Sequence, residues 1–180
     1  MNRKPIFALK LATLVIALGY SLILPVMPFY MENLGAGGRE LGWLTAVYAL
    51  AQTICAPFWG ALSDRIGRKP IISIGIIGYS ISLFLFGLAS SFGTLFIARS
   101  LSGILSSATS VASLAYVGDS SSEEERSKNM SQLGASMSVG VMMGPLLGGI
   151  LAGYSLALPF FTGAGISFIA FLLILTLLPE

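Results

Sequence analysis

The stretch GALSDRIGRK, residues 60–69, places Asp64, Arg65, Arg68 and Lys69 between two of the most apolar runs of the chain. The 180-residue sequence is otherwise poor in charge, with 55% hydrophobic and only 10% charged residues. Its mean hydropathy is +0.86. Soluble domains carry about 25% charged residues. The composition therefore predicts an integral membrane protein in which residues 60–69 form a short turn between two membrane spans.

Six apolar stretches are long enough to cross a bilayer, whose hydrocarbon core of about 30 Å takes about 20 helical residues. They cover approximately 6–30, 41–62, 71–90, 93–117, 131–153 and 157–178. We therefore expect an all-α membrane protein with six transmembrane helices, forming a single domain over residues 1–180.

Most lysines and arginines gather on one side of the predicted membrane, outside the spans or, for Lys10, near the start of the first span. The segments on the side of the N-terminus hold Arg3, Lys4, Lys10, Arg65, Arg68, Lys69, Arg126 and Lys128. The loops on the other side hold only Arg39, and Arg99 lies within a span. Because cytoplasmic loops carry the excess of Lys and Arg, this pattern predicts a multi-pass protein of the plasma (inner) membrane with both termini in the cytoplasm.

Two acids stand at helix ends that disfavour them. Asp64 ends the second predicted helix and Asp119 ends the fourth, on the same membrane face. The negative end of a helix dipole destabilises a carboxylate by about 0.3–1 kcal/mol. Arg68 follows Asp64 by four residues and is placed to bridge the two acids. We give a functional network and a structural role equal weight for this pair.

The acids of SSSEEERSK, residues 120–128, need no such partner. Ser122 and Glu125 have the spacing of a capping box. Glu123 and Glu124 face the positive N-terminus of the fifth predicted helix, which stabilises carboxylates. We expect capping and solvation here.

Arg99 lies about six residues inside the fourth predicted helix. Inserting an arginine in a membrane costs about 2.5–3.5 kcal/mol, so its side chain is expected to face a wet cavity. The alternative is that it extends toward the outer headgroups. Gly103 follows one turn later, and Tyr20 and Tyr48 lie deep enough in their spans to line a substrate pocket.

The fifth predicted helix carries Gly140, Gly144 and Gly148 at intervals of four residues, followed by Gly149. Such a stripe permits close helix packing. Pro145 lacks the N–H that would bond the carbonyl of Val141, which favours a bend. We expect a packing hinge, with ordinary small-residue packing as the alternative.

Most chemistry is excluded by what the sequence lacks. It has no histidine and a single cysteine, Cys55. No catalytic triad, zinc spacing or nucleotide-binding loop is present. We therefore expect no enzyme activity, cofactor, metal ion or nucleic-acid partner.

Several segments resemble the major facilitator superfamily. GALSDRIGRKP is similar to its loop signature G-x-x-x-D-R-x-G-R-[KR], and the matching residues are Gly60, Asp64, Arg65, Gly67, Arg68 and Lys69. Further similarity to its drug:proton antiporter branch lies in LGYSLILPVMP (18–28), ARSLSG (98–103) and GVMMGPLLGG (140–149).

The resemblance implies two inverted three-helix repeats that form the N-terminal half of a major facilitator fold. It implies that Asp64 and Arg68 pair with Asp119 as a gate latch against the opposite half. It also implies that the fifth helix faces that half and is associated with export. The function expected is the N-terminal half of a proton-coupled multidrug efflux transporter that works by alternating access.

The expected partners are the lipid bilayer, a small amphipathic substrate, protons and a C-terminal six-helix half. The chain ends at LLPE, where the linker between halves would begin, and no carboxylate lies deep in a span. The acids that couple transport to protons are therefore expected in the other half. A second identical copy is the less favoured partner, because Glu123, Glu124 and Glu125 would repel Asp64 of that copy. The alternatives are half of a metabolite uniporter or symporter, and a membrane module without transport activity.

Overall fold

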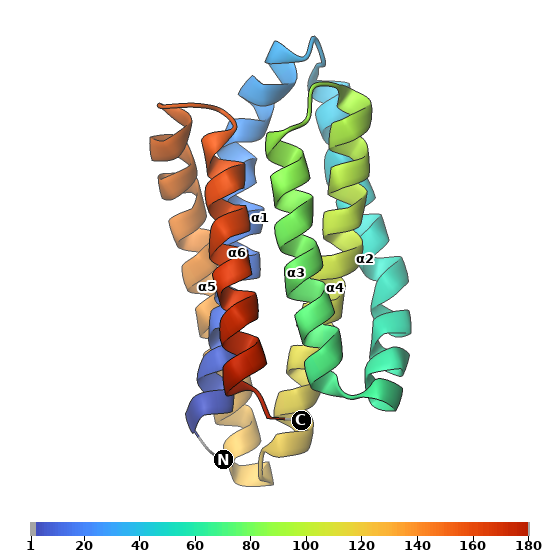
Figure 1. Ribbon diagram of the computed structural model, residues 1–180, viewed down its shortest axis with the longest axis vertical. Helices are drawn as coiled ribbons and strands as arrows, with labels where there is room; N and C mark the ends of the chain where they lie inside the picture. Colours follow the sequence, from blue (N-terminus) through green and yellow to red (C-terminus); the bar gives the residue numbers. More distant parts are fainter. Residues whose placement is uncertain (1–2, 180) are drawn as a thin grey trace.

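Six helices account for nearly all of the chain in the computed structural model, which describes residues 3–179 (Figure 1). They are α1 (Arg3–Asn33), α2 (Gly38–Ile66), α3 (Arg68–Gly87), α4 (Phe92–Ser120), α5 (Glu123–Ala152) and α6 (Leu158–Leu177). All six are long and apolar enough to cross a membrane. The predicted all-α, six-helix fold is therefore confirmed. The side chains of Arg3 and Lys4, and Glu180, lie outside the described residues.

The observed helices extend past most of the expected spans, and the largest difference is at α5. This helix begins at Glu123 instead of 131 because Ser122 caps its N-terminus. The Ser122 hydroxyl accepts a hydrogen bond from the backbone N–H of Glu125 at 3.4 Å. The capping contact predicted from their spacing is confirmed, and it extends the helix through the acidic turn.

Gly67 alone connects α2 to α3. Its backbone has φ +97° and ψ 158°, a region that only glycine adopts without strain. The turn is therefore very tight, and it brings the first residue of α3 back over the last turn of α2.

The helices run alternately up and down, so the start of α1, the end of α6, and the α2–α3 and α4–α5 connections share one end of the bundle (Figure 1). We call this the terminal end. The main packing pairs are α1 with α5 and α6, α4 with α2 and α3, and α3 with α6. The same set of pairs is obtained when α1 is exchanged with α4, α2 with α5 and α3 with α6. Since α1 and α4 run in opposite directions, the packing agrees with two inverted three-helix repeats.

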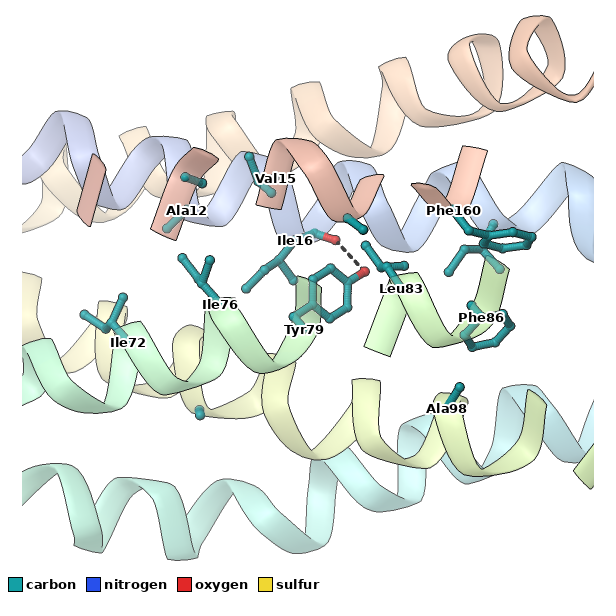
Figure 2. Packing of buried hydrophobic residues seen from close by; sticks show 14 of the residues in the cluster. Ala12, Val15, Ile16, Ile72, Ile76, Tyr79, Leu83, Phe86, Ala98 and Phe160 are labelled. Carbon is teal, nitrogen blue, oxygen red and sulfur yellow. Dashed lines mark hydrogen bonds between the residues drawn. The ribbon is translucent and has the colours of Figure 1, made fainter. Parts of the chain in front are cut away.

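The core is built around α3, whose buried side chains point toward α1 and α6 (Figure 2). They recur at intervals of three or four residues, as a buried helix face requires. These residues are Ile72, Ile76, Tyr79, Leu83 and Phe86. The Tyr79 hydroxyl is satisfied by donating a hydrogen bond to the carbonyl of Ile16 at 3.3 Å.

Two helices leave most of their surface uncovered. In α2 and α5 only a small part of the most apolar segment is buried, whereas more than half of it is buried in α1, α3 and α4. Large apolar side chains are exposed along both helices, namely Trp43, Leu50, Ile54 and Phe58 on α2, and Met137, Met142, Leu146 and Ile150 on α5. These surfaces are available to lipid or to a further protein segment.

The glycines of α5 sit directly on the backbone of α1. A Cβ atom at Gly140 would lie 2.5 Å from the carbonyl oxygen of Leu14, and one at Gly148 would lie 2.5 Å from that of Leu22. A Cβ at Gly144 would collide with Ser21 and lie 2.8 Å from the backbone nitrogen of Leu22. The contact is reinforced by the Ser21 hydroxyl, which donates to the carbonyl of Gly140 at 3.0 Å. Close packing of this stripe is therefore observed, with α1 as its partner.

We expect Gly144→Ala to lower the free energy of unfolding by about 1–3 kcal/mol, because the added methyl group meets atoms that cannot move aside. Gly149→Ala is the matched control, since a Cβ there meets nothing within 4 Å. It should be neutral or slightly stabilising through helix propensity. Unfolding of both variants in mixed micelles is the measurement. Equal stability of the two would contradict the role assigned to the stripe.

Candidate functional site

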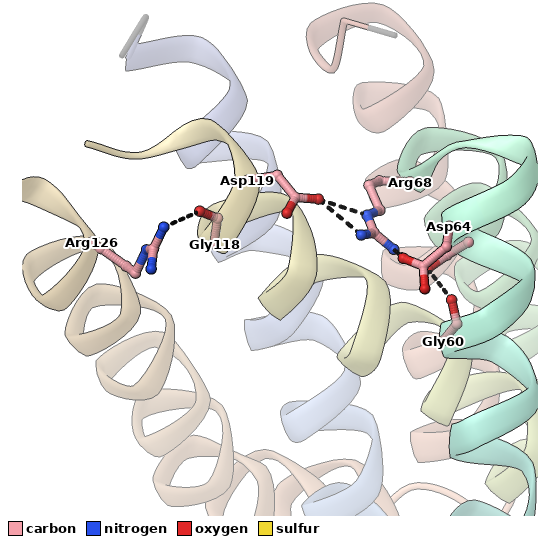
Figure 3. Close-up of polar contacts among 7 residues, drawn as sticks. Gly60, Asp64, Arg68, Gly118, Asp119 and Arg126 are labelled. Carbon is pink, nitrogen blue, oxygen red and sulfur yellow. Dashed lines mark hydrogen bonds and ion pairs between the residues drawn. The ribbon is translucent and has the colours of Figure 1, made fainter. Parts of the chain in front are cut away.

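Arg68 lies between two carboxylates at the terminal end of the bundle (Figure 3). Its Nη1 is 2.5 Å from Oδ1 of Asp64, and its Nη2 is 2.9 Å from Oδ2 of Asp119. Its Nε donates to the same oxygen of Asp119 at 3.0 Å. The bridge predicted from spacing is confirmed as a contact. We call Asp64, Arg68 and Asp119 the charge cluster.

The fold positions each member of the charge cluster. Asp64 lies in the last turn of α2 and Asp119 in the last turn of α4, so both stand at negative helix ends. The tight turn at Gly67 brings Arg68 between them. Ser63 orients the guanidinium, because its hydroxyl accepts from Nη1 at 2.6 Å and donates to the carbonyl of Gly60 at 2.9 Å. The single positive charge of Arg68 thus offsets part of the negative charge of both acids, which the helix dipoles do not stabilise.

The charge cluster adds little to stability. The side chains of Asp64 and Asp119 are 64% and 62% exposed, and that of Arg68 is 21% exposed. Exposed ion pairs contribute about 0–1 kcal/mol each, and salt screens them. The cluster therefore joins the ends of α2, α3 and α4 in a defined but easily reversed arrangement.

The other residues of the loop signature have simpler surroundings. A Cβ at Gly60 would be in ordinary contact with Val111, at 3.5 Å, across the α2–α4 interface. Arg65 is exposed and Lys69 is half-buried. Within residues 3–179, no ion pair involves either of them. Nearby, Arg126 of α5 donates to the carbonyl of Gly118 at 3.0 Å and so caps the end of α4 (Figure 3).

Arg99 is buried inside the bundle, with only 3% of its surface exposed. The carbon at the centre of its guanidinium lies 4.4 Å from the ring centroid of Tyr48 and 5.3 Å from that of Tyr20. The rings of Tyr20 and Tyr48 are themselves 5.1 Å apart. Both distances to the cation lie within the range of a cation–π interaction. Arg99 therefore does not extend toward the headgroups.

The two tyrosines differ in their hydrogen bonding. The Tyr48 hydroxyl is hydrogen-bonded to the Ser106 hydroxyl at 3.1 Å. Among the described residues, the Tyr20 hydroxyl has no hydrogen-bond partner, and Tyr20 is only partly buried. The guanidinium Nη1 of Arg99 is buried without any hydrogen-bond partner in the described part of the chain.

A pocket of about 260 Å³ lies between α1, α2, α4 and α5, and we call it the central pocket. Tyr20 and Tyr48 line it, together with Gln52, Ser110 and the exposed Met137. All its lining side chains in the described residues are uncharged. Arg99 lies behind the two tyrosines and does not line the pocket itself.

Gly103 has a packing position outside this pocket. A Cβ there would lie 2.5 Å from the carbonyl oxygen of Tyr48 and 3.1 Å from the Cβ of Ala51. It brings α4 close to α2, which places Tyr48 over Arg99. The sequence expectation grouped Gly103 with the substrate cavity, whereas its contacts are with the α2 backbone.

Sequence reasoning missed two polar contacts of this region. Gln52 follows Tyr48 by four residues, so their shared helix face was a readable signal. Ser106 lies in a run of small residues and carries no pattern that separates it from its neighbours. Only the packing of α2 on α4 identifies it.

The glycine stripe of α5 packs inside the bundle. Gly140, Gly144 and Gly148 are buried against α1. That another face of α5 meets an opposite half stays a prediction. Pro145 and Gly149 are exposed on the other side of the helix. The surface that α5 leaves for a further partner is therefore its Met142 and Leu146 face.

Among the described residues, no group of three or more His, Cys, Asp or Glu side chains comes together. Cys55 is a free, partly buried thiol.

Known proteins have similar sequences and a similar fold. The chain is 38% identical over 170 residues to multidrug resistance protein 2 of Bacillus subtilis, covering 94% of this chain and 42% of that protein. It is 34% identical over 177 residues to the quinolone resistance protein NorA of Staphylococcus aureus, covering 98% of this chain and 46% of that protein. The chain thus spans about half the length of the relatives it matches.

The crystal structure of the human organic anion transporter MFSD10 (TETRAN) superimposes with a TM-score of 0.85 at 26% sequence identity. The match covers 99% of this chain and 48% of that protein. A family model described as Major Facilitator Superfamily matches residues 9–180. This multi-pass membrane chain therefore belongs to the major facilitator superfamily.

Proposed function

We propose that this chain forms the N-terminal half of a proton-coupled multidrug efflux transporter that works by alternating access. The observation that carries the proposal is the central pocket, which is apolar, aromatic and located between α1, α2, α4 and α5. A small amphipathic substrate suits such a lining. Support comes from two relatives at 38% and 34% identity, whose names refer to multidrug and quinolone resistance.

In this proposal the opposite half covers the central pocket from the exposed faces of α2 and α5. Substrate would bind between the halves, as is usual for transporters built from two repeats. The charge cluster would then act at the terminal end, by holding α2, α3 and α4 in the arrangement of one gate state. Its small net stabilisation suits this role, because the gate must open again.

We place the terminal end in the cytoplasm of a plasma-membrane protein. Arg65, Arg68, Lys69 and Arg126 all lie at that end, whereas Arg39 starts α2 at the opposite end. Lysine and arginine are enriched in cytoplasmic loops. Both chain termini would therefore be cytoplasmic.

A different six-helix half is the partner that we favour over a second identical copy. The chain covers 42% and 46% of the two relatives. In a homodimer, Asp64 of one copy would approach the first turn of α5 in the other, which holds Glu123, Glu124 and Glu125. Repulsion there would offset the attraction of the helix dipole.

Dye efflux from proteoliposomes that contain the chain together with its C-terminal half tests the function directly. Ethidium efflux should stop when a protonophore collapses the proton gradient, because the gradient supplies the free energy. Efflux that survives would favour a uniporter, and no flux under any gradient would favour a membrane module without transport activity.

Asp64→Asn and Asp119→Asn should each reduce ethidium efflux by up to about fivefold while the amount of folded protein stays near normal, because each removes a contact of one gate state worth about 1 kcal/mol or less. Glu124→Gln is the matched control, since it removes the same charge from an exposed site at the same end. Efflux rates and monodisperse protein yield are compared. Normal efflux in both aspartate variants would refute the latch.

A double-mutant cycle tests whether Arg68 and Asp119 act as a pair. Arg68→Gln and Asp119→Asn combined should impair efflux less than the product of the two single effects, since residues in contact are coupled. If the efflux of the double variant equals the product of the two single effects, the contact between Arg68 and Asp119 has no part in transport.

The mass of the complex in mild detergent tests the partner. We expect the chain alone to be an inactive monomer and co-expression with the C-terminal half to restore efflux. A stable homodimer that transports ethidium would overturn this assignment.

A further inference from the structure

The guanidinium of Arg99 lacks a hydrogen-bond acceptor. Its Nη1 is buried and has no hydrogen-bond partner within residues 3–179, although an arginine in a membrane costs about 2.5–3.5 kcal/mol on insertion scales. Buried charged groups are as a rule paired or fully hydrogen-bonded. The rings of Tyr20 and Tyr48 offset part of the charge through their faces, but a ring face does not replace a hydrogen-bond acceptor for Nη1.

Among the described residues, no acid forms an ion pair with Arg99. At the same end of the bundle, Glu32 is exposed and Glu40 accepts a hydrogen bond from the backbone N–H of Gly37. All lining side chains of the central pocket are uncharged. The charge cluster lies at the terminal end, whereas Arg99 is in the second turn of α4, at the opposite end. A carboxylate is the acceptor that matches a guanidinium best, because it takes charge-assisted and often bidentate hydrogen bonds.

We propose that Arg99 forms a carboxylate-binding subsite at the base of the central pocket, with Tyr48 as its fixed wall and Tyr20 as its movable cover. Tyr48 is anchored by Ser106 at 3.1 Å and is only 8% exposed. Tyr20 lines the pocket, has no hydrogen-bond partner among the described residues, and stands farther from the cation. Displacement of the Tyr20 ring opens Nη1 to the pocket.

The inference deepens the proposed function, on which it rests for its role in transport. The carboxylate has two possible sources, a substrate or an acid of the C-terminal half, and the chemistry at Arg99 is the same for both. In either case the N-terminal half contributes positive potential to the pocket. Selectivity for cationic substrates would then depend on the opposite half.

Equilibrium binding of 1-naphthoate to the chain in lipid nanodiscs tests the subsite, with the neutral 1-naphthamide as the matched probe. The two probes share shape and apolar area, so only the carboxylate distinguishes them. We expect naphthoate to bind at least about tenfold more tightly, as a charge-assisted hydrogen bond provides. Equal affinity, or no binding of naphthoate, would overturn the proposal.

Variants assign the preference to the residues. Arg99→Gln should remove the preference for naphthoate and leave naphthamide binding unchanged, and Arg99→Lys should retain only part of it, because the planar donor fork is lost. Tyr20→Ala should keep or raise naphthoate affinity, whereas Tyr48→Leu should lower it. If Arg99→Gln fails to fold, the different responses of the two tyrosine variants still decide the matter. Equal loss in both variants would contradict a fixed wall and a movable cover.

Repeating the titration with the C-terminal half present identifies the source of the carboxylate. If naphthoate binding is lost there but present in the chain alone, the acid belongs to the C-terminal half. If binding persists, it belongs to the substrate. Ethidium efflux in parallel proteoliposomes keeps the two proposals separate: efflux without a naphthoate preference overturns only the subsite, and the preference without efflux overturns only the transport function.

Discussion

Close approach of helix backbones at glycine is the contact on which this bundle depends. In lipid, apolar side chains gain little by leaving hydrocarbon for another helix, so association relies on close packing and interhelical hydrogen bonds. Gly144 seats α5 on α1, Gly103 seats α4 on α2, and Gly75 seats α3 on α4, where a Cβ would lie 2.8 Å from the carbonyl oxygen of Leu105. The first two contacts set the spacing within the helix pairs α1–α5 and α2–α4, which line the central pocket. The positions of Tyr20 and Tyr48 follow from it.

The two arginines, Arg68 and Arg99, have different surroundings and different roles. Arg68 is partly exposed and paired with two exposed acids, so its contacts form and break at a cost of about 1 kcal/mol or less each. Arg99 is held in a buried aromatic setting whose cost is several-fold larger. The ring of Tyr48, whose hydroxyl is hydrogen-bonded to Ser106, offsets part of this cost through a cation–π interaction with Arg99. The reversible site lies at one end and the fixed charge toward the other.

The fold was predictable because hydropathy, helix length and loop charge are local properties of the sequence. The contact of Arg68 with Asp64 was predictable for the same reason, since i and i+4 residues are neighbours, and Asp119 shares their membrane face. The setting of Arg99 was not, because it joins residues of α1, α2 and α4 whose rotation about their axes depends on glycine packing. The same limit explains α5: its sequence predicts a flat stripe, but nothing in the sequence says that α1 occupies it.

The packing of the α5 glycine stripe on α1 limits how these two helices can move. Pro145 removes a backbone hydrogen bond to the carbonyl of Val141, which on its own favours bending. However, Gly140 and Gly148 are both seated on α1, one on each side of Pro145. A bend at Pro145 would separate at least one of these contacts and leave a void in the helix interface. We therefore expect α1 and α5 to move as one rigid unit that presents the exposed Met142 and Leu146 face of α5.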